Sequence, residues 1–183
     1  METPLNGPDV GPPTLERIRR APKVLLHDHL DGGLRPSTII ELADETGYAD
    51  LPTTDADELA AWMLRGANRK DLTLYLETFA HTVGVMQTAP AIERVARECA
   101  EDLATDGVVY AEIRFAPELH TERGLSLDAV IEAVITGFEA GASGTDLTIR
   151  IICSAMRHLD RGLEVAQVAV RHRDHGVVGF DIA

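Results

Sequence analysis

The sequence contains few cysteines and no long apolar run. Its two cysteines, Cys99 and Cys153, lie far apart, so the chain lacks the framework of a disulfide-stabilised domain and is expected in a reducing compartment. No segment has the length of a membrane span, and the opening METPLNGPDVGPP lacks the apolar core of a signal peptide. These absences predict a cytoplasmic protein without a membrane partner.

Positive charge is also scarce. The 183 residues include 17 Lys and Arg against 30 Asp and Glu, which gives a formal net charge of −13. A strongly acidic surface repels the phosphate groups of nucleic acids and of anionic lipids. The composition therefore argues against nucleic acid as a partner.

The apolar residues that are present predict an α/β domain. With 45% hydrophobic residues the chain can build one sizeable core, and residues 1–13 are expected to form a flexible arm before a domain at 14–183. Apolar runs rich in β-branched residues predict strands, and amphipathic segments predict helices between them, an alternation typical of parallel βαβ units. The expected strands are residues 23–29, 108–116, 147–155 and 177–183, and the expected helical segments are 14–21, 35–47, 55–66, 71–86, 89–107, 126–143 and 163–176.

The segment HDHLDGG, residues 27–33, places polar side chains at the end of the first expected strand. Side chains alternate along a strand, so His27, His29 and Asp31 share one face while Asp28 points the other way. Two neighbouring imidazoles can bind one zinc ion, and the glycine pair allows a sharp turn close to a ligand. The alternative is an ordinary polar strand end with hydrogen-bonded histidines. The position after the first strand, the aspartate and the glycines favour the metal site.

Five segments together resemble a known family. Their order and approximate spacing are those of adenosine deaminases, zinc enzymes of the amidohydrolase superfamily. The segments are PKVLLHDHLDGGLRP, DLTLYLETFAHTV, GVVYAEIRFAPELH, CSAMRH and VVGFDIA. The resemblance implies an α/β fold of the (β/α)8 TIM barrel type, of which this chain would supply about the first four strands and their helices.

The resemblance also implies a reaction and roles for three residues. His27 and His29 match two ligands of Zn²⁺, His29 and Asp31 match substrate-binding residues, and Asp31 matches the carboxylate that accepts a hydrogen bond from the ribose 5′-hydroxyl. The implied reaction is hydrolytic deamination of adenosine and 2′-deoxyadenosine to inosine and ammonia in purine salvage, by a zinc-activated water. A carboxylate at position 31 favours a nucleoside over a nucleotide, whose phosphate it would repel, and over a free base. Another purine nucleoside stays an alternative substrate.

Two further groups of residues have two interpretations each. An apolar helical stripe is formed by Leu72, Tyr75, Leu76 and Phe79. It matches the wall of the nucleoside pocket in the family, although packing in the hydrophobic core predicts the same spacing. Met156, at the end of a strand, is either a substrate contact or a packing residue.

Other charged residues and histidines are given structural roles. Glu112 and Arg114 alternate onto one face of the second strand and are expected to pair with each other. His158 is expected to be a hydrogen-bonded loop residue. His172 and His175 are expected at a helix end, where cations suit the helix dipole. None of these three histidines is expected to bind metal.

The motifs leave the remaining groups of the reaction unplaced. A catalytic zinc site has three protein ligands, whereas these motifs supply two, and the family's third histidine and proton-donating glutamate lie beyond the fourth strand. We therefore expect the N-terminal half of a deaminase, with no catalytic residue in this chain and no turnover by residues 1–183 alone. The alternative is a non-catalytic half-barrel that binds zinc or pairs with another chain through its open strand edges. The oligomeric state stays open.

Overall fold

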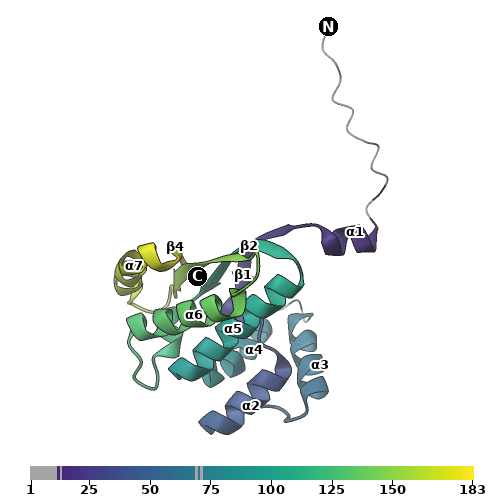
Figure 1. The fold of residues 1–183 in the computed structure, drawn as a ribbon. Coiled ribbons are helices and arrows are strands. Elements are labelled where there is room, and N and C mark those ends of the chain that lie inside the picture. The colour runs from purple at the N-terminus through teal and green to yellow at the C-terminus, as the bar shows by residue number, and fades with distance from the viewer. Residues whose placement is uncertain (1–11, 13, 69, 71) are drawn as a thin grey trace.

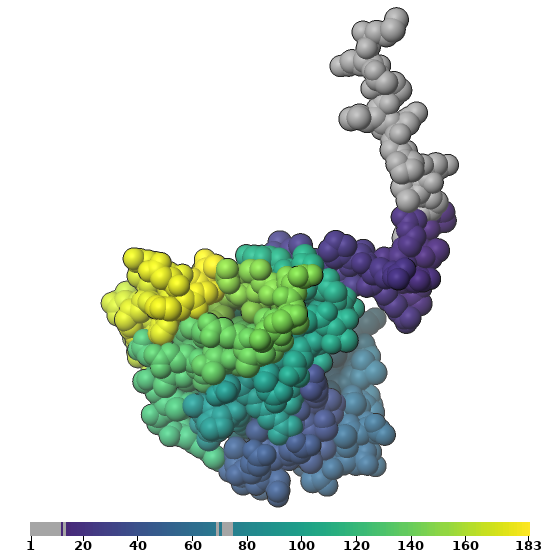
Figure 2. All heavy atoms as spheres, viewed as in Figure 1, coloured from purple at the N-terminus to yellow at the C-terminus, as the bar shows by residue number. Residues whose placement is uncertain are grey.

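The computed structural model describes residues 12, 14–68, 70 and 72–183, with the side chains of 72–74 excluded. The arm predicted for residues 1–13 lies outside the described residues, apart from residue 12. Helix α1 (Leu15–Arg20) begins after Thr14, whose hydroxyl accepts a hydrogen bond from the amide of Arg17. Figures 1 and 2 show α1 standing away from the body of the chain, and none of its residues is buried.

Four strands form one parallel sheet. The strands are β1 (Lys23–His29), β2 (Val108–Phe115), β3 (Thr148–Ala155) and β4 (Val177–Ile182), paired in the order β1-β2-β3-β4. Their bounds agree with the sequence prediction to within one residue at either end. Because neighbouring strands run in the same direction, the carboxyl ends of all four lie at one edge of the sheet, where ligands bind in open and closed α/β sheets.

Helices fill the connections between the strands, as predicted. The first connection holds α2 (Pro36–Thr46), α3 (Ala56–Ala67), α4 (Leu72–Val85) and α5 (Ala89–Thr105), the second holds α6 (Leu127–Ala142), and the third holds α7 (Gly162–Arg171). Three short 3₁₀ turns, η1 (Leu30–Gly32), η2 (Pro117–His120) and η3 (Arg173–His175), follow β1, β2 and α7. Within the part of the chain that the structure describes, no helix is both long and apolar enough to span a bilayer.

The hydrophobic core lies between one face of the sheet and the helices (Figure 1). Helices α5 and α6 pack closely at Gly137, where an added Cβ would lie 2.3 Å from the carbonyl oxygen of Glu93. Glycine is therefore needed at this helical position because the two backbones approach each other. Cys99 and Cys153 are both free thiols, and Cys153 is fully buried.

The other face of the sheet carries polar side chains. In the register of β1 with β2, Asp28 lies opposite the core residue Ile113, whereas His29 lies opposite Arg114. Asp28 therefore faces the helices and His29 faces away from them, as strand alternation predicts.

Candidate functional site

His27 and His29 lie next to each other at the carboxyl end of β1. Their ring centroids are 5.4 Å apart with an interplanar angle of 44°, so the two side chains occupy the same face of the strand. Both residues are exposed, and 45% of the His29 side chain is accessible. The structure thus leaves two imidazoles open toward one region beside the polar face of the sheet.

Asp31 is buried beside His29. Its Oδ1 is 3.9 Å from Nδ1 of His29, too far for a hydrogen bond, and this oxygen has no hydrogen-bond partner among the described residues. Burial raises the pKa of Asp31 to about 6. Burial, followed by the charges of His27 and Arg114, lowers the pKa of His29. Near neutral pH, Asp31 is therefore an anion with an unused oxygen, and His29 is a neutral imidazole, the form that binds metal ions.

A cavity of about 370 Å³ opens beside Asp31, within the size range of small-molecule sites. Its wall is formed by the turn after β1 and by α3 and α4. Phe79 of this wall also lies edge-on to His29, with ring centroids 6.4 Å apart, and Tyr75 lies edge-on to Phe79 at 5.3 Å. The lining residues include Asp31, Gly32, Gly33, Met63, Leu64, Tyr75, Thr78 and Phe79. The aromatic pair of α4 therefore connects the cavity to the histidines.

The structure divides the residues predicted for the pocket wall. Tyr75 and Phe79 line the cavity, whereas Leu76 does not, and 53% of its surface is exposed. Leu72 begins α4, but its side chain lies outside the described part of the chain. Met156 is half-buried directly after β3 and does not line this cavity.

Arg114 forms an ion pair with Asp181 and not with Glu112. Its Nη1 is 2.6 Å from Oδ2 of Asp181 on β4, while Glu112 accepts a hydrogen bond from the hydroxyl of Tyr110. The predicted Glu112–Arg114 pair is therefore wrong. The physical reason is that inward side chains of alternate barrel strands share a layer, which brings β2 residues to β4 residues across β3. Ser154 of β3 donates to Oδ1 of the same carboxylate at 2.5 Å. No motif in the sequence indicated Asp181 or Ser154, although this layering was a usable signal.

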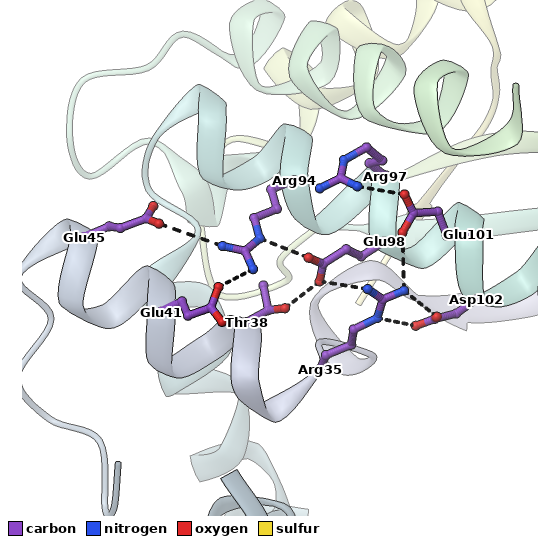
Figure 3. A network of polar contacts seen from close by, with 9 residues as sticks. All are labelled: Arg35, Thr38, Glu41, Glu45, Arg94, Arg97, Glu98, Glu101 and Asp102. Atoms are coloured by element: carbon purple, nitrogen blue, oxygen red, sulfur yellow. Dashed lines mark hydrogen bonds and ion pairs between the residues drawn. The ribbon is translucent and has the colours of Figure 1, made fainter. Parts of the chain in front are cut away.

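The turn that carries Asp31 is held by an ion network between α2 and α5. Figure 3 shows Arg35, the N-cap residue of α2, directed at acidic side chains of α5. Its Nε and Nη2 donate to the two carboxylate oxygens of Asp102 at 3.0 and 2.6 Å. The buried carboxylate of Glu98 accepts a hydrogen bond from Thr38 at 2.6 Å. Because Arg35 lies three residues after the end of η1, these contacts fix the start of α2, close to the turn, relative to α5.

The described residues do not form a complete metal site. Within this described portion, no three His, Cys, Asp or Glu side chains are grouped so that they could hold an ion. The two imidazoles fit two positions of a zinc site, so that a further ligand would have to come from another segment or chain.

The three histidines predicted at a helix end or in a loop lie at such positions. His172 is the C-cap residue of α7, and its Nε2 lies 3.0 Å from Oδ1 of Asp128. His175 ends η3, and His158 is an exposed loop residue.

Comparison with known proteins matches nearly all of the described chain to one family. A family model described as adenosine deaminase matches residues 22–183. An adenosine deaminase of Mycolicibacterium gilvum is 64% identical over 177 residues, which make up 94% of this chain and 49% of that protein. The chain spans about half the length of the curated relatives it matches.

Solved structures share the fold. The Arabidopsis N6-mAMP deaminase superposes with a TM-score of 0.78 at 28% identity, over 92% of this chain and 52% of its own. An adenine deaminase from Arthrobacter aurescens gives a TM-score of 0.74 at 27% identity, over 88% of this chain and 48% of its own. Four parallel strands with flanking helices therefore form part of a TIM barrel, and the predicted fold class is confirmed.

Proposed function

The chain belongs to the adenosine deaminase family, and we propose that it forms the N-terminal half of an enzyme that hydrolyses adenosine and 2′-deoxyadenosine to inosine and ammonia. The observation that carries the proposal is the pair of imidazoles beside a buried carboxylate with an unused oxygen. We place this reaction in purine salvage and the enzyme in the cytoplasm. The two free thiols support a reducing compartment.

Asp31 supports a nucleoside as the substrate. The two fold neighbours named above act on a nucleotide and on a free base by their names, so the fold alone does not select a substrate class. A buried anionic oxygen accepts a hydrogen bond from a hydroxyl group and repels a phosphate. The aromatic side chains of Tyr75 and Phe79 offer a flat apolar wall for a purine.

We further propose that His27 and His29 bind Zn²⁺. Asp31 lies 3.9 Å from Nδ1 of His29 without a hydrogen bond, and its negative charge favours a cation beside the two imidazoles. When bound, the ion supplies an activated water as the nucleophile, with further ligands from outside the described residues.

The chain's own residues then bind and orient the substrate. Asp31 accepts the hydrogen bond from the 5′-hydroxyl, and Tyr75 and Phe79 cover the purine and exclude water from it. The contacts of Arg35 with α5 keep the turn in place. In this proposal no described residue donates the proton to the purine, and that group belongs to the other half of the barrel.

Exposed apolar side chains on both edge strands favour a second candidate function. Four of these side chains are between 40% and 60% exposed: Val24 and Leu26 of β1, and Phe180 and Ile182 of β4. A half-barrel without its other half would cover these residues by pairing with another chain. It would then be a zinc-binding or interaction module without catalytic activity.

An assay of the natural-length protein, meaning the whole translated product that contains residues 1–183, tests the proposal. We expect conversion of adenosine to inosine, its loss in the His29→Ala variant, and no turnover by residues 1–183 alone. We also expect kcat/KM for adenosine to exceed that for AMP and for adenine by about tenfold or more, because the latter two leave Asp31 repelled or unpaired. A natural-length protein that deaminates none of the three would refute the proposal and favour the half-barrel module.

A further inference from the structure

Glu118 is a buried carboxylate in the turn after β2. The residue lies in η2 and is 5% exposed, and its Oε1 accepts a hydrogen bond from the backbone N–H of Met156 at 2.5 Å. Met156 directly follows β3, so this contact joins the carboxyl ends of two neighbouring strands. The second oxygen, Oε2, is buried and has no hydrogen-bond partner within the described chain.

The same turn is attached to the end of α4 on its other side. The side-chain amide of Gln87 donates to the carbonyl oxygen of Leu119 at 2.8 Å, and its oxygen accepts from the amide of Glu122 at 3.1 Å. Nδ1 of His120 lies 3.1 Å from the carbonyl oxygen of Met86. The turn therefore lies between α4, which bears the aromatic wall, and the turn after β3.

A carboxylate is not required merely to hold one amide. Burial of an ionised carboxylate is unfavourable unless charge and hydrogen bonds compensate it, and a neutral glutamine would offer the same acceptor oxygen. The positive charge of Arg161 compensates in part for the burial of the Glu118 carboxylate. The hydrogen bond to Glu164 is the main cause that raises the pKa of Arg161, and the charge of Glu118 raises it further. A charged acceptor holds an amide in a shorter and more fixed contact than a neutral one does.

We propose that Glu118 is a positioning residue of the nucleoside site. Met156 does not line the cavity beside Asp31, but it follows β3 at the same edge of the sheet as the two histidines. Through the amide of Met156, Glu118 fixes this segment relative to the aromatic wall on α4. The inference rests on the proposed function, because the position of Met156 affects substrate binding only if a nucleoside binds at this edge of the sheet. Glu118 acts through Met156 and does not itself contact the substrate.

Amide hydrogen exchange in residues 1–183 tests the contact without any assay of activity. We expect Glu118→Ala to speed exchange at the Met156 amide by about tenfold or more, the factor expected for loss of a hydrogen bond to a charged group. Glu118→Gln should keep most of the protection, and Glu122→Gln, which changes an exposed carboxylate four residues further on, should change nothing at Met156. Unchanged exchange at Met156 in Glu118→Ala would overturn the proposal.

Kinetics of the natural-length protein test the role in the pocket. We expect Glu118→Ala to raise KM for adenosine severalfold with little change in kcat. Glu118→Gln keeps an acceptor of lower strength and should give a KM between those of wild type and Glu118→Ala. A loss confined to kcat, or an unchanged KM with a broken Met156 contact, would overturn the positioning role. An inactive wild-type protein would instead refute the proposed function, and the exchange measurement would still decide the contact between Glu118 and Met156.

Discussion

The carboxylate of Asp181 on β4 lies 2.6 Å from the guanidinium of Arg114 on β2, although β3 separates the two strands. Both side chains are on the polar face of the sheet, and Arg114 is also opposite His29 in the register of β1 with β2. Together with the hydrogen bond from Ser154 of β3 to Asp181, the ion pair joins β2, β3 and β4 close to the two histidines.

Removal of Asp181 should destabilise residues 1–183. Asp181→Ala leaves the largely buried Arg114 without its opposite charge, and we expect a loss of about 2–4 kcal/mol in the free energy of unfolding, measured by urea denaturation. The matched control is Asp174→Ala, which breaks the exposed pair with Arg173 and should cost less than about 0.5 kcal/mol. Equal losses in both variants would show that the Arg114–Asp181 pair contributes no more to stability than an exposed ion pair does.

His120 should make the chain sensitive to acid. It is fully buried, and burial lowers its pKa to about 4 from 6.5. The unfolded chain therefore binds the proton first, so the stability present above pH 6.5 is lost as the pH falls toward 4. Between pH 7 and pH 4.5 we expect wild type to lose about 2 kcal/mol more unfolding free energy than His120→Leu does. His158→Gln, a change at an exposed histidine, should lose as much as wild type; an unchanged pH dependence in His120→Leu would contradict the assignment.

Gly137→Ala should disrupt the packing of α5 against α6. The new Cβ would lie 2.3 Å from the carbonyl oxygen of Glu93, a backbone atom that cannot move aside alone. We expect a loss of about 2 kcal/mol or more in the free energy of unfolding, despite the better helix propensity of alanine. Glu132→Ala introduces the same residue at an exposed position of α6 and should change stability by less than about 0.5 kcal/mol. Stabilisation by Gly137→Ala would mean that the two helices are further apart than described.

The role of Asp31 can be separated from general damage by a change of substrate. In the natural-length protein, Asp31→Ala should lower kcat/KM for adenosine by about tenfold to a hundredfold, the range for a hydrogen bond to a charged group. The same variant should lose much less with 5′-deoxyadenosine, which lacks the hydroxyl that Asp31 is proposed to bind. Equal losses with both substrates would show that Asp31 only supports the turn.

The sequence was sufficient to predict the features that depend on local periodicity. The two-residue period of a strand placed His27 and His29 on one face, and flanking proline and glycine marked the ends of α2. Contacts between distant segments were not accessible in this way. The partner of Arg114 depends on how β2 and β4 are tilted and spaced, and a lone acidic residue such as Glu118 in a turn carries no periodic signal. The position of Leu76 outside the cavity likewise depends on how α4 is rotated against α3.

Zinc content of the natural-length protein tests the central claim that His27 and His29 bind one ion together. We expect about one zinc ion per chain in wild type and in His158→Ala, and near-complete loss of zinc in His27→Ala and in His29→Ala. Full zinc content in either of the last two variants, with the fold retained, would contradict the claim.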